Sequence, residues 1–246
     1  WLQEYSSYDS PNLFEAGPGK GTLLKDMLKT FDKISPILSE SLIYIVEKSP
    51  YFKGKIKSEI PLKKIKFIDN INSLPDSPIF GVMNEFLDAV GVRQIQFDGK
   101  NWYWILIDYK IVNNSIKFYF TKGDKINKND LKKFIFPKVL KKNMILEINI
   151  FAEEFISKLS KIISKKGGGI LIFDYGKENN VGNTIKVTGN NNKENFLNIL
   201  ENQDVTHDVD FRALKFVAQK NGARLIGPIN QGTFLKELGI ETRLKM

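Results

Sequence analysis

The feature that most constrains the fold is the glycine run Asn12-Leu-Phe-Glu-Ala-Gly-Pro-Gly-Lys-Gly-Thr-Leu-Leu24. Its first apolar residues suit the end of a buried strand, which Glu15 closes. Three glycines follow at alternate positions (Gly17, Gly19 and Gly21), and apolar residues then recur at helical spacing (Leu23, Leu24, Met27, Leu28 and Phe31). Strand, glycine turn and helix predict the first unit of a nucleotide-binding α/β sheet.

The spacing of the glycines narrows the choice of ligand. A dinucleotide site has G-x-G-x-x-G, so an NAD-dependent oxidoreductase is not expected, and a phosphate P-loop needs lysine directly before a hydroxyl residue. Here Gly21 separates Lys20 from Thr22. The pattern E-x-G-x-G-x-G is instead similar to that of class I S-adenosylmethionine (SAM) methyltransferases. The alternative interpretation is a glycine-rich surface turn.

Composition excludes several classes of protein. The 246 residues contain no cysteine and one histidine, His207, which excludes a disulfide scaffold, a cysteine nucleophile and a multi-histidine metal site. No metal ligands are therefore predicted. No apolar run approaches the roughly 20 residues of a membrane helix, so membrane insertion is not expected. The net charge of +9 comes almost entirely from scattered lysine. Nucleic-acid interfaces favour arginine, so a nucleic-acid partner is not expected, although the positive charge leaves nucleic-acid methylation open as an alternative.

Four further buried strands are predicted, at 41–47, 64–69, 79–83 and 170–176. The second strand of the chain ends at Glu47, where an acid can accept hydrogen bonds from ribose hydroxyls. An ordinary strand-end carboxylate is the alternative. Asp174 ends the last strand. The sequence thus predicts a doubly wound sheet with a ligand at its carboxyl edge.

Two acids and an amide follow the 79–83 strand: Asn84, Glu85 and Asp88. Ligands of open α/β sheets bind at this end of central strands. Glu85 and Asp88 are three residues apart, so on a helical turn they would share one face. The alternative is that they are acids of the first turn of a helix, placed there by its dipole.

An antiparallel β insertion is expected after Gly91, with strands at 93–97, 102–108 and 116–120 separated by Asp98-Gly99 and Asn113-Asn114 turn signals. The predicted division is therefore 1–90 (first half of the Rossmann-like domain), 91–145 (insertion) and 146–246 (second half). Other expected elements are a loop at 121–130, a strand at 144–148, a loop at 179–195, a strand at 224–226, a short helix from Pro50, and helices at 151–164, 211–222 and 232–239.

With these segments in place, the chain resembles the MidA family of SAM-dependent methyltransferases. The matching blocks follow the family's order over nearly the whole chain: 15–23, 46–50, 84–89 with Gln94, 173–176, 205–211, and 227–235 with 238–240. The mitochondrial members of that family are complex I assembly factors that dimethylate a protein arginine.

The resemblance implies the class I SAM-methyltransferase fold, SAM as cofactor and a protein substrate, possibly a subunit of respiratory complex I. It implies cofactor contacts from Glu15, Gly17, Gly19, Gly21, Glu47 and Asn84. Glu85 is the first candidate for orienting the acceptor arginine, and Asp88, Asp174 and Asp210 are weaker candidates for the same role. The expected location is the cytoplasm of a bacterium or the mitochondrial matrix of a eukaryote. The oligomeric state is left open.

The chain also departs from the family's pattern. Asp208 stands where the family has histidine, His207 stands where alanine is usual, and Lys20 replaces an arginine. Asn190, Asn191 and Asn192 lie where another family histidine is expected. The chain begins at Trp1, without the family's opening Tyr-Asp and Thr-Ser-Pro block, so the natural start is expected to lie outside this sequence. These departures keep open an alternative function, a catalytically inactive SAM-binding or ligand-free assembly scaffold.

Overall fold

A computed structural model describes residues 12–34, 38, 40–179, 181–187, 197 and 203–245. The chain divides into two compact units. The first comprises Trp1–Phe86, Phe155–Asp174 and Ala218–Arg224, and the second comprises Leu87–Glu154, Tyr175–Val217 and Leu225–Met246. Both predicted boundaries, after residues 90 and 145, fall inside the second unit. That unit also takes in part of the predicted second half of the Rossmann-like domain.

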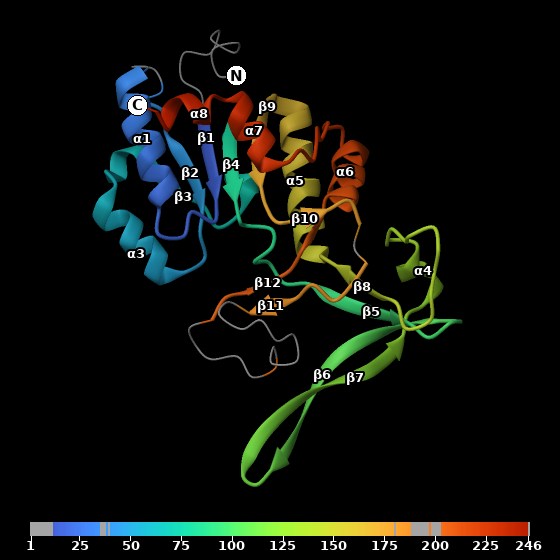
Figure 1. The fold of residues 1–246 in the computed structure, drawn as a ribbon. Coiled ribbons are helices and arrows are strands. Elements are labelled where there is room, and N and C mark those ends of the chain that lie inside the picture. Colours follow the sequence, from blue (N-terminus) through green and yellow to red (C-terminus); the bar gives the residue numbers. More distant parts are fainter. Residues whose placement is uncertain are drawn as a thin grey trace. The chain divides into compact units, whose positions relative to one another are not determined.

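The first unit is built on a parallel sheet in the order β3-β2-β1-β4-β9 (Figure 1). Its strands are β1 (Asn12–Ala16), β2 (Ile43–Val46), β3 (Ile65–Phe67), β4 (Ile79–Asn84) and β9 (Gly168–Phe173). All five predicted buried strands are therefore present. The chain runs outward from β1 to β3 and then returns to place β4 on the other side of β1. This reversal is the topological switch point of a doubly wound sheet, and the predicted architecture is confirmed.

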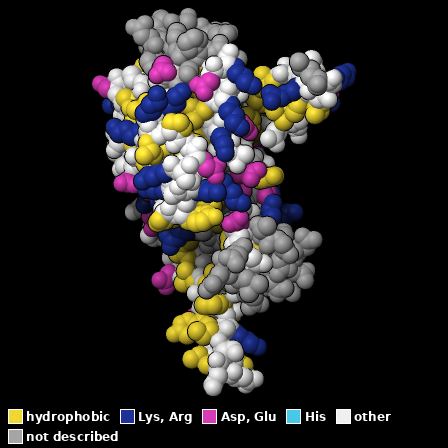
Figure 2. Space-filling model, turned by 90° about the vertical axis from the view of Figure 1, so that its left-hand side faces the viewer, with side chains coloured by type: hydrophobic (Ala, Val, Ile, Leu, Met, Phe, Trp, Pro, Cys, Tyr) yellow, Lys and Arg dark blue, Asp and Glu magenta, His cyan; other side chains and the backbone are white. Residues whose placement is uncertain are grey.

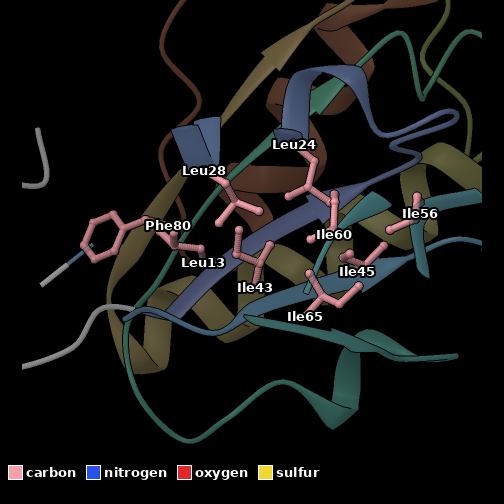
Figure 3. Packing of buried hydrophobic residues seen from close by; sticks show 9 residues of the cluster. All are labelled: Leu13, Leu24, Leu28, Ile43, Ile45, Ile56, Ile60, Ile65 and Phe80. Atoms are coloured by element: carbon pink, nitrogen blue, oxygen red, sulfur yellow. The ribbon is translucent and has the colours of Figure 1, made fainter. Parts of the chain in front are cut away.

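Helices cover both faces of this sheet (Figure 1). Helices α1 (Thr22–Ile34) and α3 (Pro50–Glu59) lie on one face, where α3 begins at the predicted Ser49-Pro50 signal. Helix α5 (Ile150–Lys166) covers the other, where Phe155 packs on Phe86 with ring centroids 5.1 Å apart. Figure 3 shows the core beneath α1 and α3, formed by nine buried residues: Leu13, Leu24, Leu28, Ile43, Ile45, Ile56, Ile60, Ile65 and Phe80.

The second unit contains an antiparallel sheet in the order β7-β6-β5-β8, as the predicted insertion requires. Its strands are β5 (Arg93–Phe97), β6 (Trp102–Val112), β7 (Ser115–Lys125) and β8 (Ile145–Ile148). The β6–β7 turn has left-handed backbone at Asn113 (φ 50°) and Asn114 (φ 56°). Because two successive left-handed residues make a type I′ hairpin turn, the asparagine pair was a correct signal.

The remaining described elements are short. They are β10 (Gly176–Lys177), β11 (Lys186–Val187), β12 (Val205–Thr206), β13 (Val209–Asp210), α4 (Lys128–Leu131), α6 (Phe211–Lys220), α7 (Gln231–Glu237), α8 (Ile240–Arg243), and the 3₁₀ turns Leu62–Lys64 and Ile71–Ser73. The predicted strand at 224–226 is wrong, because these residues are irregular. The predicted loop at 121–130 is also wrong, since it holds the end of β7 and most of α4. Part of the predicted 179–195 loop, including Asn190, Asn191 and Asn192, lies outside the described residues.

Candidate cofactor site

The glycine loop connects β1 to α1 through left-handed backbone at Gly17 (φ 68°), Gly19 (φ 54°) and Gly21 (φ 76°). The Gly17 N–H donates to the Val46 carbonyl at 2.9 Å, which ties the loop to the end of β2. A Cβ on Gly17 would lie 2.6 Å from Phe86 Cδ2, so only glycine fits there. The loop is thus fixed by both conformation and packing.

Helix α1 starts directly after the loop, at Thr22, and has no acidic residue in its first turn. The positive end of its dipole and its first N–H groups are therefore directed at the glycine turn. A ligand carrying a carboxylate or another anionic group is favoured at such a position.

A cavity of about 400 Å³ opens beside this loop. Its lining combines the end of β1, the loop, the first turns of α1 and the end of β4: Glu15, Gly17, Pro18, Thr22, Leu23, Asp26 and Asn84. It therefore lies at the carboxyl edge of the sheet, at the switch point between β1 and β4, where open α/β sheets bind their ligands. Its volume falls in the range of small-molecule sites.

Glu15 is the unusual residue of this cavity. Its side chain is only 2% exposed, and burial raises its pKa to about 7. No described residue donates a hydrogen bond to its Oε2 atom, although a buried carboxylate normally finds a partner. A ligand with a cationic or hydrogen-bond-donating group would supply the missing partner. The amino group and the hydroxyl groups of SAM meet this requirement, and its carboxylate suits the start of α1.

We expect the stability of the ligand-free protein to depend on pH through Glu15. The folded-state pKa, about 7, lies above the ordinary value of 4.5, so the folded protein loses stability as pH rises between these values. Glu15→Gln removes that loss and should stabilise the protein by up to about 3 kcal/mol at pH 8, but by much less at pH 5. Urea unfolding at both pH values measures the difference.

Glu147→Gln is the matched control, because both carboxylate oxygens of this second buried glutamate accept hydrogen bonds. Its Oε1 accepts from Gln94 Nε2 and the Thr184 N–H, both at 2.9 Å, and its Oε2 accepts from the Thr184 hydroxyl. We expect this variant to gain no stability at pH 8, since an amide replaces an acceptor that is already satisfied. If both variants gained the same stability at pH 8, the gain in Glu15→Gln could not be attributed to the buried carboxylate of Glu15 and its unpartnered Oε2 atom.

The other predicted cofactor residues lie at the same edge of the sheet. Asn84 ends β4 and lines the cavity. Glu47 follows β2 directly, and its Oε1 accepts from the Ser49 N–H at 2.8 Å. Glu47, Gly19 and Gly21 do not line the cavity, although β2 pairs with β1 up to Ala16 and Val46. Their contacts with a cofactor remain predictions.

Glu85 and Asp174, two of the predicted catalytic acids, lie beyond the ends of neighbouring strands of the first unit. Asn84 pairs with Phe173, and the Glu85 N–H donates to the Phe173 carbonyl at 2.8 Å. Glu85 has left-handed backbone (φ 47°), a strained conformation for a residue with a side chain. Strain of this kind concentrates at functional sites. No helical turn forms between Glu85 and Asp88, so the condition under which these two acids would share one face is not met.

Asp88 and Asp210, the other two predicted acids, are buried in the second unit at 4% and 9% exposure. The backbone carbonyl of Asp88 accepts a hydrogen bond from the backbone N–H of His207, at 3.1 Å. Asp210 caps α6, because its Oδ1 accepts from the N–H groups of Arg212 (2.9 Å) and Ala213 (3.2 Å). Burial raises the pKa of Asp210. Asp210 therefore has a structural task that the sequence prediction did not assign.

Glu153 was not predicted. It lines a small cavity of about 10 Å³ in the second unit together with Asp210, and burial, helped by the Asp210 charge, raises its pKa to about 7. A space of this size holds about one water molecule. Glu153 stands in the first turn of α5, where acids are common, so its sequence position gave no signal.

His207 and Asp208 occupy the block that departs from the family's pattern. His207 is 4% exposed, with Nε2 2.9 Å from Asn149 Nδ2 and Nδ1 3.0 Å from the Asp208 carbonyl. This buried and hydrogen-bonded position indicates a structural role for His207. Asp208 forms ion pairs with Lys177 (3.4 Å) and Lys186 (3.5 Å).

The sheet order, the glycine loop and the cavity together define the fold of a class I SAM-dependent methyltransferase. A family model described as "Putative S-adenosyl-L-methionine-dependent methyltransferase" matches residues 1–229. The chain belongs to this family. The predicted family and fold are confirmed, and SAM is confirmed as the family's cofactor.

Curated relatives carry a more specific name. The protein arginine methyltransferase NDUFAF7 of mitochondria is 29% identical in Homo sapiens and 28% identical in Bos taurus, and each alignment covers 95% of this chain. The chain spans about 57% of the length of both relatives.

Two solved structures from Burkholderia thailandensis share the fold. One has a TM-score of 0.74 at 19% identity and covers 99% of this chain and 66% of its own. The second, with a TM-score of 0.73 at 20% identity, covers 99% of this chain and 64% of its own, and was crystallised with S-adenosyl-homocysteine. In the described part of the present chain, no helix is both long and apolar enough to cross a membrane.

Proposed function

We propose that this chain transfers a methyl group from SAM to an arginine of a partner protein linked to respiratory complex I assembly. The observation that carries the proposal is the cavity at the switch point, with the buried Glu15 and its unpartnered Oε2 atom. The arginine acceptor is taken from relatives named protein arginine methyltransferases. The complex I partner, and a location in the bacterial cytoplasm or the mitochondrial matrix, follow from the family resemblance.

The residues of the first unit divide the binding of the cofactor between them. The glycine loop and Glu15 hold the methionine part of SAM. Glu47 accepts hydrogen bonds from the ribose hydroxyls, and Asn84 contacts the cofactor from the end of β4. SAM, when bound, supplies an electrophilic methyl group on a sulfonium sulfur. Because the loop and α1 are held by packing, the protein positions this group without first ordering a flexible segment.

The acceptor needs help from carboxylates. The guanidinium group of arginine is protonated in water, with a pKa above about 12, and is a poor nucleophile. In the proposed mechanism Glu85 hydrogen-bonds the guanidinium, localises its charge on one side and orients one nitrogen toward the methyl group. That nitrogen would gain the methyl group as the methyl–sulfur bond breaks and a neutral thioether leaves, and Glu85 would take the proton that the nitrogen loses. Asp174, beyond the neighbouring strand end, is the second candidate for this task.

We expect Glu85→Gln to lower methyl transfer by about 100-fold or more, since a general base typically contributes this much. Cells lacking the natural protein would be complemented with the wild type or the variant, and arginine methylation of purified complex I would be measured by mass spectrometry. Asp76→Asn is the matched control, because Asp76 is a highly exposed acid of the same unit whose side chain pairs with Lys166 at 3.2 Å. The control should restore methylation fully. Normal methylation with Glu85→Gln would exclude Glu85 as the base.

One observation favours the alternative, a SAM-binding or ligand-free assembly scaffold. Asp208 stands where the family has histidine, and its carboxylate is held by Lys177 and Lys186. A carboxylate has no ring N–H to donate, so it cannot perform every task of the family's histidine. The same experiment separates the two functions, because a scaffold would restore complex I assembly with no change in arginine methylation.

A further inference from the structure

The β6–β7 hairpin carries an apolar face that no described element covers. In an antiparallel pair, residues directly opposite each other point to the same side of the ribbon. The register pairs Ile107 with Phe120, Tyr109 with Phe118, and Ile111 with Ile116. These three pairs alternate with the intervening pairs, so all six side chains lie on one side. We call this surface the ribbon face: Ile107, Tyr109, Ile111, Ile116, Phe118 and Phe120.

Every residue of the ribbon face is exposed, from 43% for Phe120 to 70% for Ile111. Figure 2 shows hydrophobic side chains gathered on the hairpin, at the lower end of that view. The opposite side is mostly polar, with the pairs Leu106–Thr121, Asp108–Tyr119, Lys110–Lys117 and Val112–Ser115. The hairpin is therefore amphipathic, and its apolar side is largely exposed.

Such a surface is costly for an isolated chain. A two-stranded ribbon is at best marginally stable in water unless its apolar face is packed. With about 180 Å² for each fully exposed side chain, the exposed fractions of these three isoleucines and three aromatic residues give an apolar area of about 600 Å². This is at the upper end of the patches found on monomeric proteins, and patches of this size usually mark an interaction site.

We propose that the ribbon face is a homodimer interface, in which the hairpins of two copies pack face to face. A two-fold contact needs a surface that is complementary to itself. The ribbon face meets this condition because it is continuous, apolar and free of charged side chains. Two copies would together bury about 1,200 Å², which reaches the range of stable protein interfaces.

The distribution of charge agrees with a second copy as the partner. The protein carries a net charge of +9, so two copies repel each other unless their lysines are kept apart. Lys110 and Lys117 lie on the opposite side of the ribbon. Lys122, at the base of the ribbon face, has its Nζ 3.4 Å from the centroid of the Tyr103 ring. Lys110, Lys117 and Lys122 therefore do not stand between the two apolar surfaces.

Two other partners fit less well. An extended peptide binds to the edge of a sheet through backbone hydrogen bonds, whereas the apolar surface here is a face. A membrane would have to accommodate the outer edge of β7, where no described strand pairs with it, and unpaired backbone groups are costly in lipid. A second ribbon face avoids both difficulties.

Sedimentation equilibrium of the chain, from about 1 to about 100 µM, tests the proposal. We expect a monomer–dimer equilibrium. Ile107→Lys should weaken the dimer by about 100-fold or more, because it buries an unpaired charge in the apolar contact. Leu106→Lys is the matched control: Leu106 is the neighbouring residue, 45% exposed against 52% for Ile107, but lies on the opposite side. It should leave the dissociation constant unchanged.

Cysteine substitution keeps the test decisive if Ile107→Lys fails to fold. The chain has no cysteine, so Ile107→Cys and Leu106→Cys each introduce a single thiol. A short bis-maleimide should cross-link two copies through Cys at 107 and not at 106. A chain that is monomeric throughout the range, or a dimer equally sensitive to both lysine variants, would overturn the proposal. So would a monomer that binds phosphatidylserine vesicles through the ribbon face.

Discussion

Gly17→Ala is expected to weaken S-adenosyl-homocysteine binding by about 100-fold or more, since a displacement of about 1 Å in a positioning group can cost this much. Gly17 has left-handed backbone at φ 68°, and its new Cβ would lie 2.6 Å from Phe86 Cδ2. Because Phe86 packs on Phe155, the ring cannot move away without disturbing α5. The loop must shift instead, and Gly17 lines the cavity. Isothermal titration calorimetry measures the change.

Gly19→Ala is the control for this effect. Gly19 has a similar backbone conformation, φ 54°, but no described residue other than its chain neighbours lies within 4 Å of the position of its Cβ, and it does not line the cavity. The two variants therefore share the conformational strain, of about 1–2 kcal/mol, and differ in the clash. Binding that is unchanged in Gly17→Ala, or reduced equally in both, would show that the loop does not position the ligand in this way.

Gly81→Ala is expected to destabilise the protein by about 3 kcal/mol or more, because the added methyl group has no space at the centre of the sheet. Its Cβ would lie 2.3 Å from the Phe14 carbonyl oxygen and 2.9 Å from Phe14 Cβ. Strands β1 and β4 pair at this point, so the strands must separate. Because the same two strands carry Glu15 and Asn84, the variant should also lose the cavity. Urea unfolding followed by circular dichroism measures the loss of stability.

Gly54→Ala provides the matched substitution in the same unit. Gly54 lies in α3, and beyond its own helical turn no described residue lies within 4 Å of the position of its Cβ. Alanine in a helix is favoured over glycine by about 1 kcal/mol, so this variant should be more stable than the wild type. If the urea midpoint of unfolding were the same for Gly81→Ala and the wild type, the close packing of β1 against β4 would be contradicted.

The parallel sheet could be predicted because its strands are buried on both faces and therefore read as continuous apolar runs. The order of the strands adds the switch point, where the glycine loop after β1 meets Asn84 at the end of β4. Glycine spacing alone indicated which ligand class to expect. These signals are local, and the structure preserves them.

The environment of each acid could not be predicted, because burial depends on contacts between distant segments. Glu15 and Glu147 are both buried glutamates, yet only Glu147 receives hydrogen bonds from Gln94 and Thr184. Asp210 is different, because its position directly before α6 is that of an N-cap, a signal that was present in the sequence and not used.

The length of the hairpin was underestimated for another reason. Its outer part alternates apolar and polar residues, which indicates a strand with one buried face. The predicted strands ended at Asp108 and began again at Ile116, whereas β6 continues to Val112 and β7 runs from Ser115 to Lys125. The alternation is real, but its apolar face finds no cover in the described part of the chain.

The most direct test of the central claim is calorimetric titration of the folded protein with SAM and S-adenosyl-homocysteine. We expect both ligands to bind with micromolar dissociation constants. Binding should be weakened strongly in Glu47→Ala, which removes the predicted ribose contact, and in Glu15→Gln, which removes the buried carboxylate of the cavity. If the folded wild-type protein binds neither ligand, or binds them equally well in both variants, the cavity between β1 and β4 is not the cofactor site.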